Sequence, residues 1–418
     1  MDAREERGLQ IAENGHITKT PVGWKVPSQS GNGSYIVNVG EKPFCTCPDF
    51  EKRGQPCKHI HAVEFFQQRE DRPDGTTVIT KAVRITYAQD WPVYNAAQTH
   101  EAERFAELLH DLCQGIDQPA QCRRGRPSHP MSDVVFAATS KVYSTVSGRR
   151  AVRDLDEWLQ KGYLSRKPSY NSIFDYLENP SLTPLLKGLI EESAQPLSAV
   201  ETDFAVDSSG FATSTYARWF DHKYGKERTR QNWVKTHIMV GVKTHIVTAV
   251  EATPFESADA LQLPGLVNQT AKTFGINEVS ADKAYSTRKN LRAVQAQGGV
   301  AFIPFKSYSK GSQGSKPFDG LWNRLWHFYA FNRECFLEHY HKRSNVETAF
   351  SMMKAKFGAS VRAKTPTAQV NEVLCKVLAH NICCLVTSVY ELGIEPTFWK
   401  DEAHATPPVV ALDARPWN

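Results

Sequence analysis

One stretch near the carboxyl end, residues 339–358, constrains the fold more than any other, because its residues separate onto two sides of a helix. Four polar residues stand at offsets 0, 3, 7 and 14, which at about 100° per residue span roughly 60°: Tyr340, Arg343, Glu347 and Lys354. The adjoining arc is apolar and predicts a buried stripe of Val346, Ala349, Phe350, Met353 and Phe357. A carboxylate between two cations suits a site that holds a metal and a phosphate together. A solvated face with an Arg343–Glu347 pair would give the same pattern.

The composition is that of a globular protein with room for two or three domains: 418 residues, 41% hydrophobic and 23% charged. No apolar run approaches the length needed to cross a bilayer, and the first ten residues are too charged for a secretory signal. Nine cysteines, several in pairs of metal-ligand type, indicate a reducing compartment rather than a disulfide framework. The net charge of +5 decides little, but residues 121–170 carry ten Lys/Arg against four Asp/Glu, and residues 218–243 seven against two. Such basic segments favour a polyanionic partner.

A metal-ligand pattern lies in the N-terminal part, where Cys45-x-Cys47 is followed after nine residues by Cys57-x-His59. Two close pairs joined by a short loop can surround one Zn²⁺ tetrahedrally, as a Cys₃His site. His61 competes with His59 for the fourth position, and two unrelated thiol pairs are the alternative. The pattern resembles the zinc module known as SWIM, with β-prone runs before it and a helix after it. This resemblance implies a module over residues 1–70 with one structural Zn²⁺, and it favours His59.

A mixed segment, residues 71–129, ends in a basic linker whose Arg-Gly-Arg-Pro sequence contains Arg124 and Arg126. These residues resemble the core of an AT-hook, which inserts into the minor groove of DNA, and a merely basic linker is the alternative. Residues 130–196 have the pattern of short helices joined by basic turns. That pattern suits a DNA-binding region of helix-turn-helix type, and it would also suit a dimerisation bundle.

Residues 197–392 have the pattern of an α/β domain. Three strands that can meander, at 202–207, 234–242 and 245–252, come first, and helices then alternate with strands at 278–281 and 300–304. This order predicts a mixed sheet flanked by helices, against which the apolar run 367–392 packs as a helix. A Pro-rich tail, residues 393–418, follows.

Two carboxylates are expected to join Glu347. Asp207 ends the first predicted strand and Asp282 the fourth, and active groups of open α/β sheets gather at the carboxyl ends of strands. Three such acids can hold two Mg²⁺ (or Mn²⁺) ions in a two-metal phosphoryl-transfer site. Asp203, on the same face of the first strand, is an alternative to Asp207, and Asp259, inside a predicted helix, is a weaker one. Asp282 could also be an ordinary turn residue.

The strand order, the three acids and the spacing Tyr340-x₂-Arg343-x₃-Glu347-x₆-Lys354 resemble the DDE transposases of bacterial insertion sequences. The resemblance covers about residues 130–390 and implies a ribonuclease H-like core. Two features depart from the best-known members: an interval of only 65 residues between Asp282 and Glu347, and the N-terminal zinc module.

The resemblance implies a protein that cuts DNA at transposon inverted-repeat ends and joins the freed 3′-OH to target DNA. Tyr340, Arg343 and Lys354 would then lie beside the DNA, with Arg343 and Lys354 on phosphates. A homodimer or larger assembly on DNA, a bacterial cytoplasmic and nucleoid location, and no membrane are expected. A nuclease that only cleaves, or a transposase-derived zinc-containing regulator, are the alternatives.

Overall fold

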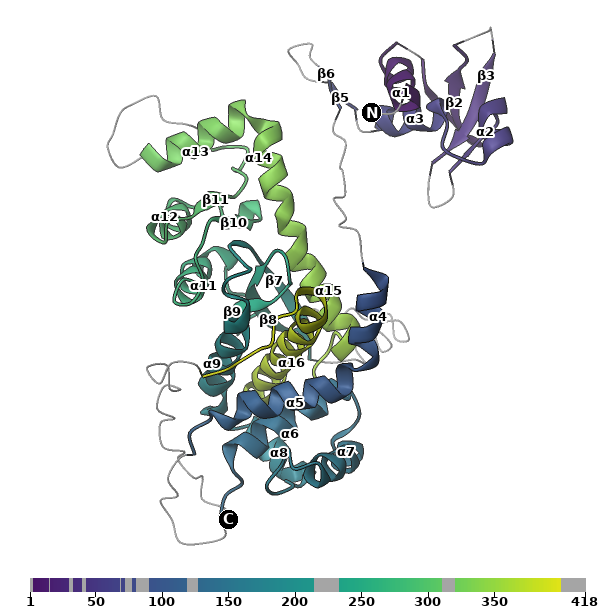
Figure 1. Cartoon of the computed structure of the whole chain (residues 1–418). Coiled ribbons are helices and arrows are strands. Elements are labelled where there is room, and N and C mark those ends of the chain that lie inside the picture. Colours follow the sequence, from purple (N-terminus) through teal and green to yellow (C-terminus); the bar gives the residue numbers. More distant parts are fainter. Residues whose placement is uncertain are drawn as a thin grey trace, which may run out of the picture. The chain divides into compact units, whose positions relative to one another are not determined.

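The structure is a computed structural model of the whole chain, and it describes residues 3–14, 16–29, 33–39, 43–67, 69–71, 77–79, 90–118, 127–213, 233–309 and 320–399. The chain divides into two compact units, Met1–Ala88 and Gln89–Asn418 (Figure 1). Arg124 and Arg126, the two arginines of the predicted AT-hook, lie outside the described residues.

The smaller unit is built on a four-stranded antiparallel sheet, with strands in the order β1 (Thr18–Thr20), β2 (Gly23–Pro27), β3 (Ser34–Asn38) and β4 (Phe44–Cys45). Three helices accompany it: α1 (Ala3–Asn14), α2 (Pro48–Arg53) and α3 (Lys58–Gln67). Helix α1 packs along α3, and a ribbon of β5 (Arg69–Asp71) and β6 (Thr77–Ile79) follows. The buried cluster contains the three cysteines of the metal-ligand pattern, and its other fully buried members are Ile11, Ile17, Val26, Val37, Ile60, Ala62 and Val63.

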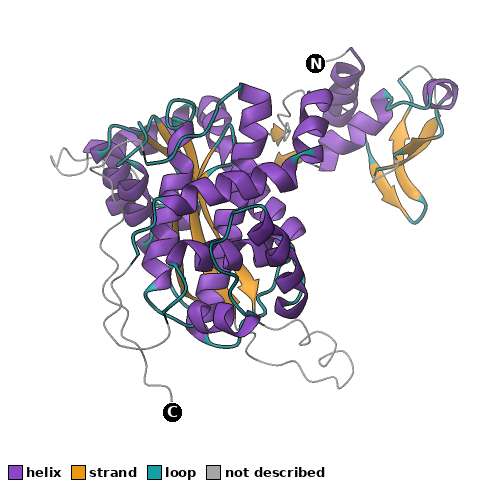
Figure 2. Cartoon of the chain, turned by 60° about the horizontal axis from the view of Figure 1, so that its bottom comes forward, coloured by secondary structure: helices purple, strands orange, loops and turns teal. Residues whose placement is uncertain are grey.

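The larger unit contains a five-stranded mixed sheet. Its strands are β7 (Asp203–Ala212), β8 (Trp233–Gly241), β9 (Val247–Pro254), β10 (Glu278–Ala281) and β11 (Val300–Phe302), in the order β11-β10-β7-β8-β9. The first three strands pair antiparallel, whereas β10 and β11 run parallel to β7. Figure 2 shows the strands flanked by helices. The prediction of an α/β fold with a mixed, helix-flanked sheet is confirmed.

The first strand of this sheet runs further than the sequence suggested. We expected it to end at Asp207, but β7 continues to Ala212, because each residue from Ser208 onward finds a partner on β8. Phe211, buried completely, anchors this extension. Asp207 is therefore in the middle of its ladder with β8, although it is the first residue beyond the ladder with β10.

Helices and short 3₁₀ turns surround the sheet. They are α9 (Leu182–Ala194), η1 (Gln195–Leu197), η2 (Asp259–Leu261), α11 (Leu263–Thr270), η3 (Lys283–Tyr285), α12 (Arg288–Ala296), α15 (Ser344–Phe357) and α16 (Pro366–Leu392). Helix α11 packs on β8 and β9, and α15 packs on β7 and β8. Asn381 of α16 accepts from the backbone N–H of Val247 on β9 (2.9 Å) and donates to its carbonyl (2.8 Å).

Helix α16 corrects one sequence expectation. By length and composition it is apolar enough to cross a membrane, so the statement that no apolar run approaches that length is wrong. Its most apolar 18-residue window is 83% buried inside the protein, where it contacts α9, α6 and the sheet. The apolar composition of α16 is thus explained by its place in the core.

In the described part of the larger unit, the helices that come before α9 are α4 (Trp91–Thr99), α5 (Glu101–Gln114), α6 (Met131–Tyr143), α7 (Gly148–Gln160) and α8 (Tyr170–Leu177). Buried side chains of α5, α6, α7 and α8 belong to one continuous hydrophobic core with those of the sheet. Helix α6 is almost wholly buried, whereas α7 buries only Gly148, Ala151 and Leu155.

The stretch 339–358 is not one straight helix. After α13 (Gly320–Phe331) and α14 (Arg333–Tyr340), a 3₁₀ turn, η5 (His341–Arg343), precedes α15. Lys342 in this turn bonds to Asp203 (2.7 Å) and Glu278 (2.8 Å), which fastens the turn to the first residues of β7 and β10. The single face predicted for Tyr340 to Lys354 is therefore broken, but the five-residue apolar stripe of α15 is buried as predicted.

Candidate active site and zinc site

Asp207 and Asp282 are neighbours on adjacent parallel strands. The ladder between β7 and β10 ends with Val206 opposite Ala281, so the next residue on each strand is one of these two aspartates. Adjacent strands lie about 4.8 Å apart, and the two carboxylates therefore leave the sheet side by side. Asp282 caps the following 3₁₀ turn, where its Oδ1 accepts from the backbone N–H of Lys283 (2.6 Å).

Glu347 reaches the same place from α15, and Arg343 connects it to the sheet. The Arg343 guanidinium donates to Glu347 Oε1 (2.6 and 2.7 Å) and to Asp207 Oδ2 (3.2 Å). The Arg343–Glu347 pair of the solvated-face alternative therefore exists, but it is part of a larger cluster that includes a strand carboxylate. The Glu347 side chain is 59% exposed, whereas Asp207 and Arg343 are 23% and 19% exposed.

Negative charge is crowded at Asp207. Burial raises the pKa of Asp207 above its usual range, and the nearby Asp282 and Glu347 carboxylates raise it further. The backbone N–H of Ser208 (2.8 Å to Oδ1) and the Arg343 guanidinium lower it in part. The three acids thus form one electrostatic cluster whose charge a single arginine does not balance.

Lys354 and Tyr340 occupy the edges of this cluster. Lys354 donates to the Ser209 hydroxyl (2.6 Å), two residues beyond Asp207 on β7, and its ammonium lies over the ring of Phe211. Burial lowers the pKa of Lys354. Tyr340 at the end of α14 hydrogen-bonds to Arg343, so all four residues of the predicted signature adjoin the site.

A hollow of about 500 Å³ opens along the part of β7 that follows Asp207. The strand segment that follows Asp207 forms one of its walls, and its lining residues are Ser208, Ser209, Gly210, Ala212, Trp233, Lys235 and Ala359. The hollow shares Ser209 with the Lys354 hydrogen bond, but the three acids are not among its lining residues.

The two alternative aspartates lie elsewhere. Asp203 is occupied by Lys342 at the beginning of β7, four residues before Asp207. Asp259 lies in the turn η2, ahead of a helix that begins later than predicted, and it pairs with Lys235 (2.7 Å). Asp207, rather than either alternative, is the strand aspartate beside Asp282 and Glu347.

The four predicted zinc ligands converge in the smaller unit. One ligand atom from each of Cys45, Cys47, Cys57 and His59 lies within 4.8 Å of the others, and all four residues are buried. His59 Nδ1 is 3.9 Å from the sulfurs of Cys45 and Cys57. A tetrahedral site with metal–sulfur and metal–nitrogen distances of about 2.3 and 2.0 Å gives a similar separation, so the donor set fits Zn²⁺.

His61 is not part of this group. It points toward Glu64, with Nδ1 3.1 Å from Oε2, one turn along the surface of α3. A hydrogen bond from Cys45 lowers the pKa of Cys57, so Cys57 favours the thiolate, the form of cysteine that binds zinc. The same contact and burial raise the pKa of Cys45, and burial raises that of Cys47, so these two thiols keep their protons until a metal binds. The eight cysteines in the described part of the chain are free thiols.

Two family models match parts of this chain. Residues 198–382 match the family model of the transposase DDE domain, and residues 35–67 match that of the SWIM zinc finger. The chain carries a transposase DDE domain and a SWIM zinc finger. The first match contains Asp207, Asp282 and Glu347, and the second contains all four cysteine and histidine ligands.

One relative of this chain is named "Probable transposase for insertion sequence element ISA1214" and comes from Archaeoglobus fulgidus. It is 31% identical over 107 residues, which are 26% of this chain and 31% of the relative. The chain thus aligns with about a third of that protein. No solved structure matches the chain.

Sequence reasoning missed several residues around the DDE carboxylates. Ser208 holds Asp207, Ser209 holds Lys354, and Lys342 fastens the turn before α15. The only sequence signal was the run of small residues after Asp207, which we interpreted as space in front of the carboxylate. It also supplies the hydrogen-bonding groups that position the site.

Proposed function

We propose that the chain is a DNA transposase that cuts the ends of an insertion sequence and joins the freed 3′-OH to target DNA by two-metal phosphoryl transfer. The observation that carries this proposal is the placement of Asp207 and Asp282 on adjacent strands, with Glu347 linked to Asp207 through Arg343. The DDE-domain match and the transposase relative support the reaction class.

The donor set suits hard divalent cations. Asp207, Asp282 and Glu347 offer carboxylate oxygens, the ligands that Mg²⁺ and Mn²⁺ prefer, and the excess negative charge at Asp207 favours added cations. When bound, two such ions supply activation of the attacking oxygen and stabilisation of the leaving oxygen. Arg343 would release the two carboxylates to the ions and become free to bind a phosphate of the substrate.

The residues of the chain orient the DNA. Lys354 stands two residues beyond Asp207, within reach of a phosphate next to the one that is cut. Tyr340 lies beside Arg343 and would help to orient its guanidinium. Ser209 holds the Lys354 ammonium in place before DNA arrives.

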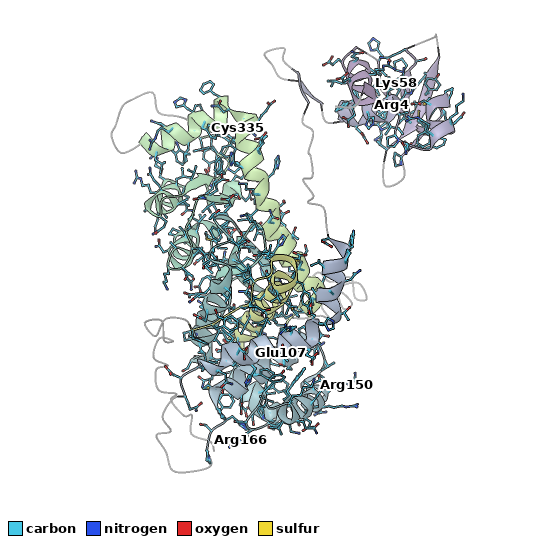
Figure 3. The ribbon with its side chains drawn as sticks, viewed as in Figure 1. Arg4, Lys58, Glu107, Arg150, Arg166 and Cys335 are labelled. Atoms are coloured by element: carbon cyan, nitrogen blue, oxygen red, sulfur yellow. The ribbon has the colours of Figure 1, made fainter. Side chains whose placement is uncertain are left out.

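Residues 130–196 are proposed as the region that grips the DNA ends. Helices α6 and α7 are joined by a four-residue turn in which Thr145 has φ +56°, a connection typical of helix-turn-helix units. The first half of α7 exposes Arg149, Arg150 and Arg153 and contains no acidic residue in its first turn. Figure 3 shows Arg150 projecting from α7. Replacing Arg150 and Arg153 by alanine should weaken DNA binding measured in EDTA.

The zinc site is proposed as a closed structural site. Four buried protein ligands complete a tetrahedron and leave no position for a substrate. The exposed Lys52 and Arg53, between the two ligand pairs, would contact DNA or a partner chain.

A strand-transfer assay tests the proposal. Purified protein, Mg²⁺ and a donor fragment with the ends of its own element should give donor ends joined to a second DNA. Hydrolysis products alone would favour the nuclease, and binding with no cleavage would favour the regulator. The element's ends are found as inverted repeats that flank the reading frame.

We also expect a homodimer or larger assembly on these ends. Light scattering of the protein alone and with end DNA measures it. A complex that contains one protein chain would contradict this expectation.

A further inference from the structure

A hydrogen-bonded chain leads from β7, the strand that carries Asp207, to η2 and β8, which carry none of the three acids. Ser208 makes two bonds in opposite directions: its backbone N–H donates to Asp207 Oδ1 and its hydroxyl donates to Asp259 Oδ1, both at 2.8 Å. Successive residues of a strand point to opposite faces, so the link passes through the strand rather than across its surface. A group on one face of the sheet is thereby connected to the carboxylate on the other.

Asp259 is itself firmly held. Lys235 of β8 pairs with Asp259 Oδ1 at 2.7 Å and donates to the carbonyl of Ser257 at 2.9 Å. The fully buried His237 lies beside the same carboxylate oxygen at 3.5 Å, and its other ring nitrogen bonds to the Thr253 hydroxyl. An acid paired in this way makes a rigid acceptor for the Ser208 hydroxyl.

Tyr285 closes the space around this chain. It follows Asp282 in the turn η3, is 1% exposed, and feels the charges of Asp207, Asp259 and Asp282. Its buried ring lowers the polarity around these carboxylates, which strengthens the hydrogen bonds that they accept.

The consequence for Asp207 is that its two oxygens are distinguished. Oδ1 is occupied by Ser208, whereas Oδ2 faces Arg343 and, through it, Glu347. We propose that Asp259 is a positioning residue for the reaction: through Ser208 it fixes the rotamer in which Asp207 offers Oδ2 to the metal ions. This inference rests on the proposed two-metal function of the site.

The test compares Asp259→Asn with the wild-type chain by calorimetric titration of Mn²⁺ without DNA, and by cleavage rate at several Mg²⁺ concentrations. Loss of a residue that orients a metal ligand reduces metal affinity or activity by about 10- to 100-fold. Added Mg²⁺ should recover part of the cleavage rate. DNA binding in EDTA should not change, because Asp259 does not touch the DNA-binding groups.

Two further variants separate positioning from general stability. Ser208→Ala removes only the hydroxyl that reaches Asp259 and should weaken Mn²⁺ binding, as Asp259→Asn does. Ser208→Thr keeps a hydroxyl and should retain the Mn²⁺ affinity of the wild type. Glu251→Gln is the matched control. Glu251, on the neighbouring strand β9, also pairs with a lysine, Lys187 of α9, and the substitution should leave Mn²⁺ affinity unchanged.

Each outcome decides something. Wild-type Mn²⁺ affinity and rate in both Asp259→Asn and Ser208→Ala would overturn the inference and leave an ordinary ion pair. Loss of Mn²⁺ binding in Asp259→Asn as complete as in Asp207→Asn would also overturn it, since Asp259 would then be a ligand. If Asp207→Asn itself kept full Mn²⁺ affinity, the proposed metal site, rather than the positioning role, would be wrong.

Discussion

The two candidate metal centres of this chain are built in opposite ways. In the SWIM zinc finger, four buried ligands lie within 4.8 Å of one another, and no other group of the described residues gathers metal-type ligands so tightly. In the DDE domain the three acids come from two strands and a helix, one of them is 59% exposed, and an arginine stands between two of them.

The difference indicates what each centre needs in order to be complete. The cysteines are part of the small unit's core, whose other fully buried members are few and modest in size, so metal binding there supplies folding free energy. The carboxylates sit on a sheet with a large apolar core of its own, and their mutual repulsion opposes folding. One centre stabilises its unit, and the other uses the stability of the rest of its unit to hold like charges together.

The largest effect is expected from the acids themselves. Asp207→Asn, Asp282→Asn and Glu347→Gln should each reduce Mg²⁺-dependent DNA cleavage by about 10³-fold or more, because each removes a charged oxygen ligand. DNA binding in EDTA should remain. Gel assays of end cleavage and of binding measure the two separately.

Asp203→Asn tests the alternative aspartate on the same strand, and it should keep most of the cleavage because Lys342 retains its bond to Glu278. Full cleavage by any one of the three variants would remove that residue from the mechanism. If Asp203→Asn were inactive and Asp207→Asn active, Asp203 would be the catalytic acid on this strand instead of Asp207.

The zinc finger should show a large effect on folding and little on the DDE domain. Chelation of zinc, or Cys57→Ser, should unfold Met1–Ala88 while the thermal transition of the larger unit stays in place. Limited proteolysis of the full chain and elemental analysis for one zinc per chain measure this.

His59→Ala should lose the metal and His61→Ala should keep it, because His61 points toward Glu64. Loss of zinc from His61→Ala but not from His59→Ala would identify His61 as the fourth ligand. Chains that fold and bind end DNA normally without zinc would remove the contrast between the two centres.

The sequence predicted the local parts of both centres well. The 3.6-residue period of α15 identified its five buried residues, the Cys/His spacing identified the buried ligand group, and the β10 strand begins and ends where it was expected. Each of these signals lies within a short segment, where periodicity or spacing determines which side chains come together.

What the sequence did not predict depends on partners far along the chain. The extension of β7 requires β8, and the break between α14 and α15 follows from Lys342 bonds that span 139 and 64 residues. The Ser208–Asp259 bond spans 51 residues and the Arg343–Asp207 bond 136. No local pattern encodes such contacts, so the acids were predicted but the groups that orient them were not.

A smaller effect separates the two cations of the DDE site. A plot of the logarithm of the DNA-binding constant against the logarithm of the salt concentration has a slope that grows by about 0.9 for each phosphate contact. Lys354→Ala should reduce this slope by about 0.9, with or without divalent ions. Arg343→Ala should reduce the slope only when Ca²⁺ is present, because in EDTA the guanidinium is neutralised by Asp207 and Glu347. Binding isotherms from 50 to 300 mM salt, about the range in which such slopes are resolved, measure it.

Lys272→Ala is the control, since Lys272 is exposed and pairs with Glu191 on the surface. An unchanged slope for Lys354→Ala would return that lysine to a role in packing on Phe211. Equal slopes for Arg343→Ala in EDTA and in Ca²⁺ would show that the arginine does not exchange the carboxylates for DNA.

The smallest effect concerns stability and pH. Burial raises the pKa of Asp207 in the folded protein above its value in the unfolded chain, so its ionisation opposes folding. The free energy of unfolding is not reduced by Asp207 below the pKa of the unfolded chain, and it falls as the pH rises from there through the pKa of the folded protein. In EDTA at pH 7, Asp207→Asn should therefore melt at a higher temperature than the wild type, and the difference should shrink as the pH falls toward the usual aspartate range.

Mg²⁺ should reverse the order of the two melting temperatures, because only the wild type gains binding free energy, about 2.7 kcal/mol at a hundredfold excess over Kd. Melting curves of the larger unit between about pH 3.5 and 8 measure both effects. A less stable Asp207→Asn at pH 7 in EDTA would mean that Ser208 and Arg343 outweigh the burial of the carboxylate, and the acid site would then stabilise its unit as the zinc site does.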